Sequence, residues 1–156
     1  MNQLILNLLS ENTVKAGVVA QDWQEAGRIA GQMLVDNGSV DPGYVDAMIR
    51  AVEELGPYIV LGPGVAMFHG RPEDGVKSIG LSVITLRAGV NFDAGDKDPV
   101  SLVFALGARD SQSHLELLAE LITIIGDTNL VQLLIKAESA TEILELINQK
   151  LSKKEG

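Results

Sequence analysis

Apolar residues recur along the chain with two different spacings, and the segments with short or continuous spacing predict strands. Residues 78–86 alternate apolar with small or polar residues, as a strand with one buried face does. Residues 100–108 are almost continuously apolar, which indicates a central strand covered on both faces. Three further strands are predicted over residues 13–20, 58–61 and 65–68, the last two separated by a glycine-rich turn.

The intervening segments carry apolar residues at helical spacing. Asp22 is placed to cap a helix that runs to about residue 36. Asp41-Pro42 begins a second helix, which Gly56-Pro57 ends. Further helices are predicted over residues 1–11, 114–125, 129–137 and 141–151. Strands mixed with helices in this order predict an α/β fold: a single-domain sandwich whose mixed parallel and antiparallel sheet is flanked by helices.

Length and charge narrow the classes of partner. The chain has 156 residues, the size of one ordinary domain, and a net charge of −9. An acidic protein lacks the basic face that neutralises phosphates, so we expect no nucleic-acid partner. A basic protein partner fits this charge better.

The chain also lacks cysteine, a signal peptide and a membrane-spanning run of apolar residues. The chain has no cysteine, which excludes disulfides and thiolate chemistry within it. Residues 1–11 have no basic start of a signal peptide, and no run approaches the roughly 18 apolar residues that span a bilayer. We therefore expect a cytoplasmic protein that does not insert into the membrane.

The chain has only two histidines, and the first of them, His69, lies where an apolar run meets a turn-forming segment. Residues 65–68 are apolar, whereas residues 70–75 hold Gly, Arg, Pro, Glu and Asp. An imidazole at the end of a buried segment, beside a glycine that lets other groups approach, is well placed to act as a nucleophile.

The second histidine, His114, follows the predicted strand of residues 100–108. Ser113 and Glu116 have the spacing of a capping box, which predicts that a helix begins at Ser113 with His114 in its first turn. Free N–H groups and the helix dipole favour an anion there and disfavour an imidazolium. If the fold brings the histidines together, one can attack a phosphorus while the other and the helix N-terminus stabilise its oxygens, with Arg71 as a further donor.

Plainer interpretations stay open at this point. A histidine is more often structural than catalytic, and His114 alone is compatible with an ordinary first-turn residue. His69, Asp74, Asp110 and His114 form a conceivable ligand set, but their spacing matches no familiar metal site, so no metal is expected. The cluster at residues 62–64 contains proline and lacks a following Lys-Ser/Thr, so a nucleotide cofactor is not supported.

At the two histidine segments the sequence resembles the EIIA domains of the mannitol/fructose class of the bacterial phosphoenolpyruvate:sugar phosphotransferase system. The nearest likeness is to the ascorbate type. The likeness is carried by Tyr44-Val-Asp-Ala-Met48, Gly56-Pro-Tyr58, the segment from Gly62 to Lys77 with its HGRPEDGV block, Asp98-Pro99, and Ser113-His-Leu-Glu116. The resemblance implies one EIIA domain over residues 1–156, with a core of about residues 10–150.

The resemblance implies a phosphohistidine relay without a cofactor. The phosphocarrier HPr would donate a phosphoryl group to His69, and His114 would help to hold it. His69 would then pass it to a cysteine of EIIB, which serves the membrane transporter EIIC. An acidic surface would meet the basic face of HPr, with an apolar centre that includes Met67 and Phe68, and with Arg71 and Ser113 as phosphate or partner contacts.

Two residues depart from the family pattern. The family usually has proline directly before the phosphorylated histidine, where this chain has Phe68, whose ring is free to pack against the imidazole or a partner. Mannitol-type members carry an arginine in the preceding helix, and Arg50 is one residue away from that place, about 100° around a helix.

Two other functions remain as alternatives. The same fold is able to serve as a regulatory module that is switched by phosphorylation of His69, and the two histidines with nearby aspartates are compatible with a metal-dependent hydrolase. The sequence leaves open which sugar is transported and whether the chain forms a homodimer.

Overall fold

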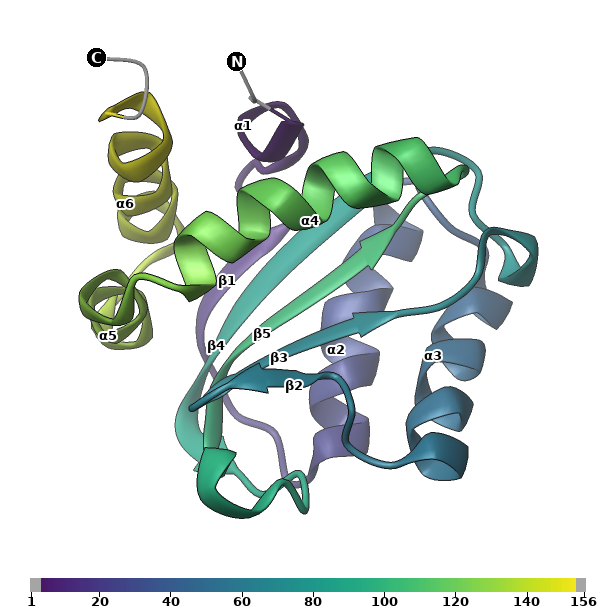
Figure 1. Ribbon diagram of the computed structural model, residues 1–156, viewed down its shortest axis with the longest axis horizontal. Helices are drawn as coiled ribbons and strands as arrows, with labels where there is room; N and C mark the ends of the chain where they lie inside the picture. Colours follow the sequence, from purple (N-terminus) through teal and green to yellow (C-terminus); the bar gives the residue numbers. More distant parts are fainter. Residues whose placement is uncertain (1–3, 154–156) are drawn as a thin grey trace.

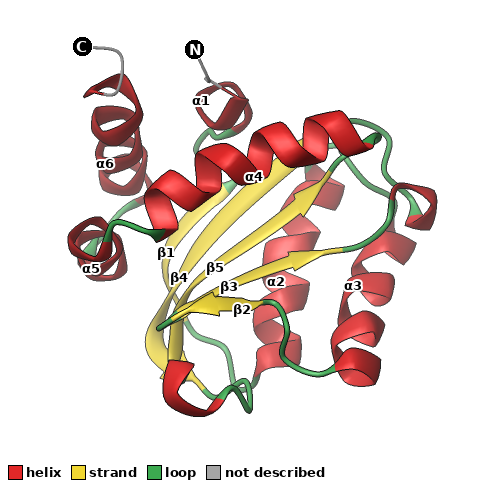
Figure 2. Cartoon of the chain, viewed as in Figure 1, coloured by secondary structure: helices red, strands yellow, loops and turns green. Residues whose placement is uncertain are grey.

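A single mixed sheet organises the chain. The computed structural model describes residues 4–153, and its five-stranded sheet has the order β1-β4-β5-β3-β2 (Figures 1 and 2). The strands are β1 (Val14–Val18), β2 (Val60–Gly62), β3 (Val65–His69), β4 (Gly80–Val90) and β5 (Val100–Gly107). β1 is parallel to β4 and β3 is parallel to β5, whereas β2 and β3, like β4 and β5, are antiparallel. The predicted mixed sheet is confirmed.

Helices cover both faces of the sheet. α2 (Trp23–Asp36) and α3 (Pro42–Leu55) pack on one face, and α1 (Leu4–Leu8), α4 (Ser111–Ile125), α5 (Thr128–Lys136) and α6 (Ala140–Lys153) pack on the other (Figure 1). Each layer has its own apolar core, one on either side of the sheet. Of the helix predicted over residues 1–11, the first three residues lie outside the described part of the chain.

The helix boundaries on the α2–α3 face follow local signals. The Asp22 carboxylate accepts a hydrogen bond of 2.8 Å from the Glu25 N–H, as predicted for an N-cap. α3 begins at Pro42 and ends before Gly56, whose φ of 89° is strained for residues with a side chain. Both predicted boundaries are confirmed.

The burial of β4 differs from the prediction for residues 78–86. Residues 80–86 are all buried, so the strand is not half-exposed as its alternation suggested. Its alternate residues serve two cores, because Leu81 and Val83 face the α4 layer while Ile84 faces the α2 layer. The small polar Ser82 is tolerated inside because its hydroxyl donates to the Ala30 carbonyl at 2.7 Å.

The pairing of β3 with β5 places the two histidine segments at one edge of the sheet. The strands are parallel, with His69 opposite Leu106, so their carboxyl ends lie side by side. From that edge β3 continues into the loop that contains η1, a 3-10 turn at Pro72–Asp74, while β5 continues into α4. Segments far apart in the sequence therefore meet at this edge (Figure 1).

The helices of residues 4–153 are too short or too polar to cross a membrane singly. Within residues 4–153 no single helix has both the length and the apolar character needed to cross a bilayer. α4 and α5 together satisfy length and composition, but they meet at a bend of 85°.

Candidate active site

The two histidines predicted to act together are in contact. The ring centroids of His69 and His114 lie 5.8 Å apart, with their planes inclined by 50°. His69 is the last residue of β3, and His114 lies in the first turn of α4, which follows β5. Their proximity therefore results from the parallel pairing of β3 with β5.

The imidazole of His69 is held in one tautomer. Its Nδ1 lies 3.2 Å from the carbonyl oxygen of Met67, and this contact requires a proton on Nδ1. Burial lowers the pKa of His69, the Met67 carbonyl opposes that shift, and His114 adds to it. The ring is thus neutral near physiological pH, and the lone pair on Nε2 is free to attack.

Tyr58 contacts the other side of this imidazole. The rings of Tyr58 and His69 meet edge to face, with centroids 5.9 Å apart and planes at 86°. Burial raises the pKa of the Tyr58 phenol, although 43% of the residue is exposed. No role in the site was predicted for Tyr58 from the sequence, although Gly56-Pro-Tyr58 is one of the segments that carry the family resemblance.

The start of α4 differs from the predicted capping box. Asp110, not Ser113, is the N-cap, and its Oδ1 accepts from the Ser113 N–H at 2.7 Å. That hydrogen bond holds the pKa of Asp110 below its usual range. Asp110 is the better cap because an aspartate in extended backbone reaches the third N–H of the helix. The N–H of Ser113 is therefore already paired, which leaves less of this helix end for an incoming anion.

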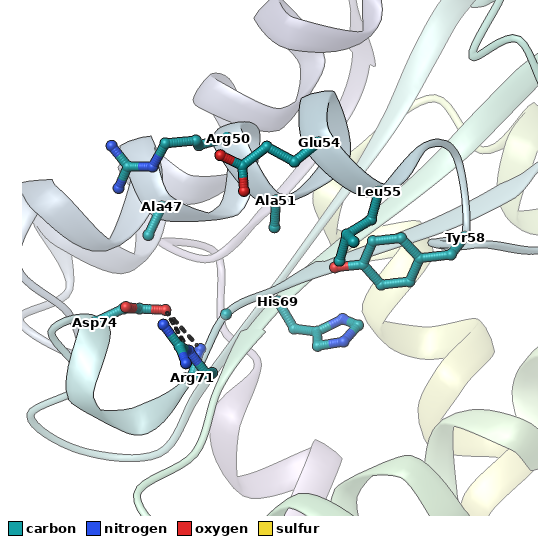
Figure 3. Close-up of a pocket in the computed structure, with 10 residues that line it drawn as sticks. Ala47, Arg50, Ala51, Glu54, Leu55, Tyr58, His69, Arg71 and Asp74 are labelled. Atoms are coloured by element: carbon teal, nitrogen blue, oxygen red, sulfur yellow. Dashed lines mark hydrogen bonds and ion pairs between the residues drawn. The ribbon is translucent and has the colours of Figure 1, made fainter.

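A cavity of about 390 Å³ opens between α3 and the His69 segment. Leu55 and Tyr58 lie over His69 at one end of it, and Arg50 and Arg71 lie toward the other (Figure 3). The ten residues that line it are Ala47, Arg50, Ala51, Glu54, Leu55, Tyr58, His69, Gly70, Arg71 and Asp74. The tertiary structure thus brings to the site Arg50, to which the sequence assigned no role.

Arg71 lines this cavity with a largely exposed side chain. Its side chain is 77% exposed, and its Nε lies 3.8 Å from Glu73 and 3.9 Å from Asp74. Exposed ion pairs of this length contribute little stability, so the guanidinium is available to a phosphate or a partner.

Met67 and Phe68 do not form the apolar surface expected around His69. Met67 is buried in the α4 layer and Phe68 in the α2 layer, so neither side chain reaches solvent in this structure. Phe68 packs against Trp23, with ring centroids 6.4 Å apart, and points away from the face that His69 occupies. The expectation that it packs on the imidazole is wrong, because consecutive residues of a strand face opposite sides.

The four residues considered as metal ligands do not assemble. Among residues 4–153 no three His, Asp or Glu side chains come close enough to hold one ion. Asp110 instead caps α4, and an Asp74 carboxylate oxygen accepts a 2.9 Å hydrogen bond from the Arg71 N–H. The geometry at this edge thus offers a nucleophilic Nε2, a second imidazole and nearby guanidinium groups, which suits attack on phosphorus better than hydrolysis at a metal.

The family model and the curated relatives that match this chain point to the same family. Residues 7–150 match the family model described as phosphoenolpyruvate-dependent sugar phosphotransferase system, EIIA 2. A curated relative, the ascorbate-specific EIIA component from Salmonella choleraesuis, is 36% identical over 144 residues, which are 92% of this chain and 94% of the relative.

Solved structures share the fold across nearly their whole length. The mannitol enzyme IIA in complex with phosphorylated mannitol enzyme IIB from Escherichia coli is 31% identical with a TM-score of 0.80, covering 90% of this chain and 97% of the other. The nitrogen regulatory protein IIA-Ntr from Neisseria meningitidis is 29% identical with a TM-score of 0.79, covering 92% and 99%.

Proposed function

The chain belongs to the EIIA 2 family of the phosphoenolpyruvate-dependent sugar phosphotransferase system, and we propose that it carries the phosphoryl group on Nε2 of His69. Members of this family are phosphotransferase components that relay phosphate between proteins. The observation that carries the assignment to His69 is its contact with Met67, because a proton fixed on Nδ1 leaves Nε2 as the nucleophile.

The first step is an in-line transfer between two nitrogens. Nε2 of His69 attacks the phosphorus of the phosphohistidine on HPr, forming a new N–P bond, while the donor nitrogen leaves with the electron pair of the old bond. The proton on Nδ1 of His69 stays in its hydrogen bond to Met67 and needs no base to remove it. No metal or nucleotide takes part in this proposal.

Neighbouring side chains stabilise the phosphoryl oxygens. His114, whose ring contacts that of His69, is placed to donate an N–H to an oxygen on the transferred group. Arg71 lines the adjoining cavity with an exposed guanidinium and supplies a further donor or a partner contact, and Ser113 lies beside His114 in the same turn. These donors stabilise the negative charge on the phosphoryl oxygens both in the transition state and in the phosphorylated protein.

The second step passes the group to sulfur. A cysteine thiolate of EIIB attacks the phosphorus, a P–S bond forms, and the pair from the P–N bond returns to Nε2 of His69. A solved relative has been described as a complex of enzyme IIA with phosphorylated enzyme IIB, which supports EIIB as the acceptor. The present chain has no cysteine, so its own residues supply no thiol for this step. EIIB would in turn serve a membrane EIIC, and the relay would operate in the cytoplasm.

The partner surface is formed by exposed apolar side chains near the histidines. Leu55 is 72% exposed, Leu115 is 64% exposed and Tyr58 is 43% exposed. Leu55 and Tyr58 line the cavity with His69, and Leu115 follows His114 in the chain. These residues replace Met67 and Phe68 as the apolar centre, and the net charge of −9 favours the basic face of HPr around it.

The sugar is proposed from the curated relative, whose name specifies ascorbate and which matches 92% of this chain. The family match over residues 7–150 supports a single EIIA domain with its core between about residues 10 and 150. The cavity beside His69 is not assigned to the sugar, because the group that is transferred here arrives on a protein.

Incubation with phosphoenolpyruvate, enzyme I and HPr, followed by intact and peptide mass analysis, tests the proposal. We expect one acid-labile phosphate on the peptide that contains His69, absent in His69→Ala and present in His114→Gln. Phosphate on His114, on another residue or on none contradicts the assignment.

A regulatory role is the second candidate, favoured by the likeness to the nitrogen regulatory protein IIA-Ntr. In that case the phosphorylated chain would donate poorly to a purified EIIB of the ascorbate type, and phosphorylation would change its binding to another protein. Measuring transfer from the phosphorylated chain to EIIB separates the two roles, since rapid transfer supports the relay.

A further inference from the structure

Tyr44 is a fully buried tyrosine in the first turn of α3, beneath the loop that follows His69. The residue has 0% exposed surface. Three glycines surround it, since a Cβ on Gly70 would lie 3.1 Å from its Cε1, one on Gly107 3.6 Å from its Cζ, and one on Gly75 3.6 Å from its Cβ. Two of these glycines follow β3 and the third ends β5, so the ring fills the space where the two strands leave the sheet.

The hydroxyl of Tyr44 joins the two segments that carry the histidines. It donates to the Leu106 carbonyl at 2.7 Å and accepts from the Gly70 N–H at 2.8 Å. The directions are fixed because an N–H only donates, which leaves the phenolic proton for the carbonyl. Burial raises the pKa of Tyr44 to about 12, so this proton is retained at physiological pH.

These two partners are adjacent to the nucleophile. Gly70 directly follows His69 in the chain, and Leu106 is the residue opposite His69 in the β3–β5 pairing. The hydroxyl oxygen of Tyr44 therefore links, through two hydrogen bonds, the peptide that follows His69 to β5, the strand that leads to His114.

The loop is also fixed to α3 at its far end. The Asp41 N–H donates to the Gly75 carbonyl at 2.8 Å, and the Asp41 carboxylate lies 3.3 Å from Nζ of Lys77. The segment from Gly70 to Gly75 is thus held at one end by the first turn of α3 and at the other by its N-cap. The position of the chain directly after His69 depends on Tyr44, since the other attachment is five residues away.

We propose that Tyr44 is a positioning residue for His69: its hydroxyl sets the path of the chain at Gly70, and through it the direction in which Nε2 faces the incoming phosphorus. This inference rests on the proposed function. The hydrogen bonds of the Tyr44 hydroxyl run to the backbone at Gly70 and Leu106 and not to the imidazole, so its proposed contribution is geometric. Displacement of a reacting atom by about 1 Å lowers a transfer rate by about 100-fold.

Tyr44→Phe tests the proposal, because it keeps the ring and removes only the oxygen. We expect the single-turnover rate of transfer from phosphorylated HPr to fall at least tenfold. We also expect the ¹⁵N shifts of the His69 ring to change, which reports a different balance between its tautomers. The transfer rate and the ¹⁵N shifts are both measured well below the unfolding temperature of the variant. At the measuring temperature nearly all molecules stay folded, so a loss of stability alone changes neither quantity.

Ser82→Ala is the matched control. Ser82 is also fully buried and its hydroxyl also donates one 2.7 Å hydrogen bond to a backbone carbonyl, but it lies on the α2 side of β4. We expect Ser82→Ala to lower the unfolding temperature without changing the transfer rate or the His69 ring shifts. If both variants change the rate equally, the effect of Tyr44 is one of general stability and the positioning role is wrong.

Gly70→Ala provides a second approach should Tyr44→Phe fail to fold. The added methyl would press on the Tyr44 ring from the loop side, and Gly70 does not need the left-handed conformation. A reduced transfer rate with altered His69 ring shifts supports the proposal, and a wild-type rate in this folded variant overturns it. If the wild-type chain itself takes no phosphate on His69, the proposed function fails instead, so the two failures are distinguishable.

Discussion

The imidazoles of His69 and His114 lie with their centroids 5.8 Å apart, although they belong to different segments of the chain. Nδ1 of His69 is committed to the Met67 carbonyl, so the two rings are not equivalent. One presents a free Nε2 on a fixed ring, and the other lies in the first turn of α4 at the same edge of the sheet. This asymmetry supports the proposal that His69 attacks and that His114 stabilises the phosphoryl group.

Removing His114 is therefore expected to slow the reaction without moving its product. In His114→Ala we expect the rate of phosphoryl acceptance to fall about 100- to 1,000-fold, as when one oxyanion donor is lost. The phosphate should remain on His69, as mass analysis of the peptides will show. His114→Gln keeps an N–H donor and should recover part of the rate. Unchanged acceptance in His114→Ala would show that the second ring is a structural neighbour only.

The pH dependence of acceptance follows from the neutral state of His69. Burial lowers its pKa below the ordinary value of 6.5, so Nε2 keeps its lone pair as the pH falls through 6.5. Titration of the His69 ring protons by NMR should give a midpoint below 6.5, with the transfer rate falling through that midpoint. The unfolded chain takes up this proton near 6.5 and the folded chain does so only at lower pH. The contribution of His69 to stability is therefore complete above 6.5 and lost below it. A midpoint above 6.5 would contradict the buried, neutral ring.

Phe68 should affect stability through its contact with Gly27. A Cβ on Gly27 would lie 2.7 Å from the Phe68 ring and 2.7 Å from Cδ1 of Ile49, so the glycine makes room for the aromatic side chain. We expect Phe68→Ala to cost about 3–5 kcal/mol of unfolding free energy.

Gly27→Ala tests the same contact from the helix side. In the wild-type background the new methyl group would crowd Phe68 and Ile49. This crowding should outweigh the higher helix preference of alanine, so we expect a net loss of unfolding free energy. In the Phe68→Ala background the ring contact is gone, and Cδ1 of Ile49, at the far end of a flexible side chain, turns into the vacated space, so we expect a gain of about 0.5–1 kcal/mol instead. Urea unfolding of both single variants and the double variant measures this change of sign. Additive effects would show that the two positions do not share the space.

Glu120 is expected to hold the N-terminal helix onto α4. It is 2% exposed, and its two carboxylate oxygens accept from the N–H groups of Leu4 and Ile5, each at 2.9 Å. Glu120→Gln replaces one acceptor by an NH₂ group that faces another donor, so we expect a loss of about 1–3 kcal/mol in urea unfolding. Glu116→Gln, on the exposed face of the same helix, is the control and should change stability little. Equal effects of the two substitutions would mean that net charge, and not the buried contact, is responsible.

Several elements could be predicted because their signals are local. The cap at Asp22 and the proline start of α3 follow from one or two residues, and β5 was recognised from its continuous apolar run. Alternation predicts a half-exposed β4, because Ser82 and Thr85 lie among its apolar residues. The structure hides both hydroxyls by hydrogen bonds to Ala30 and Gly17, which alternation alone does not reveal.

The sequence predicts some parts of the site and misplaces others, because only some of their signals are local. Residue type singled out His69 and His114, and their contact was expected on condition that the fold brought them together. The cap of α4 was misplaced by three residues, because Ser113 and Asp110 both satisfy the local rule and only the backbone path after β5 selects one.

The sequence by itself determined the order of strands and helices, the mixed α/β class and the two imidazoles, because periodicity and residue chemistry are properties of short segments. The tertiary structure alone decided that β3 lies parallel to β5, that Phe68 points away from His69, and that Tyr44 joins Gly70 to Leu106. These relationships depend on pairing between distant segments and on the side of the sheet that each residue faces, and such contacts form only when the whole sheet is assembled.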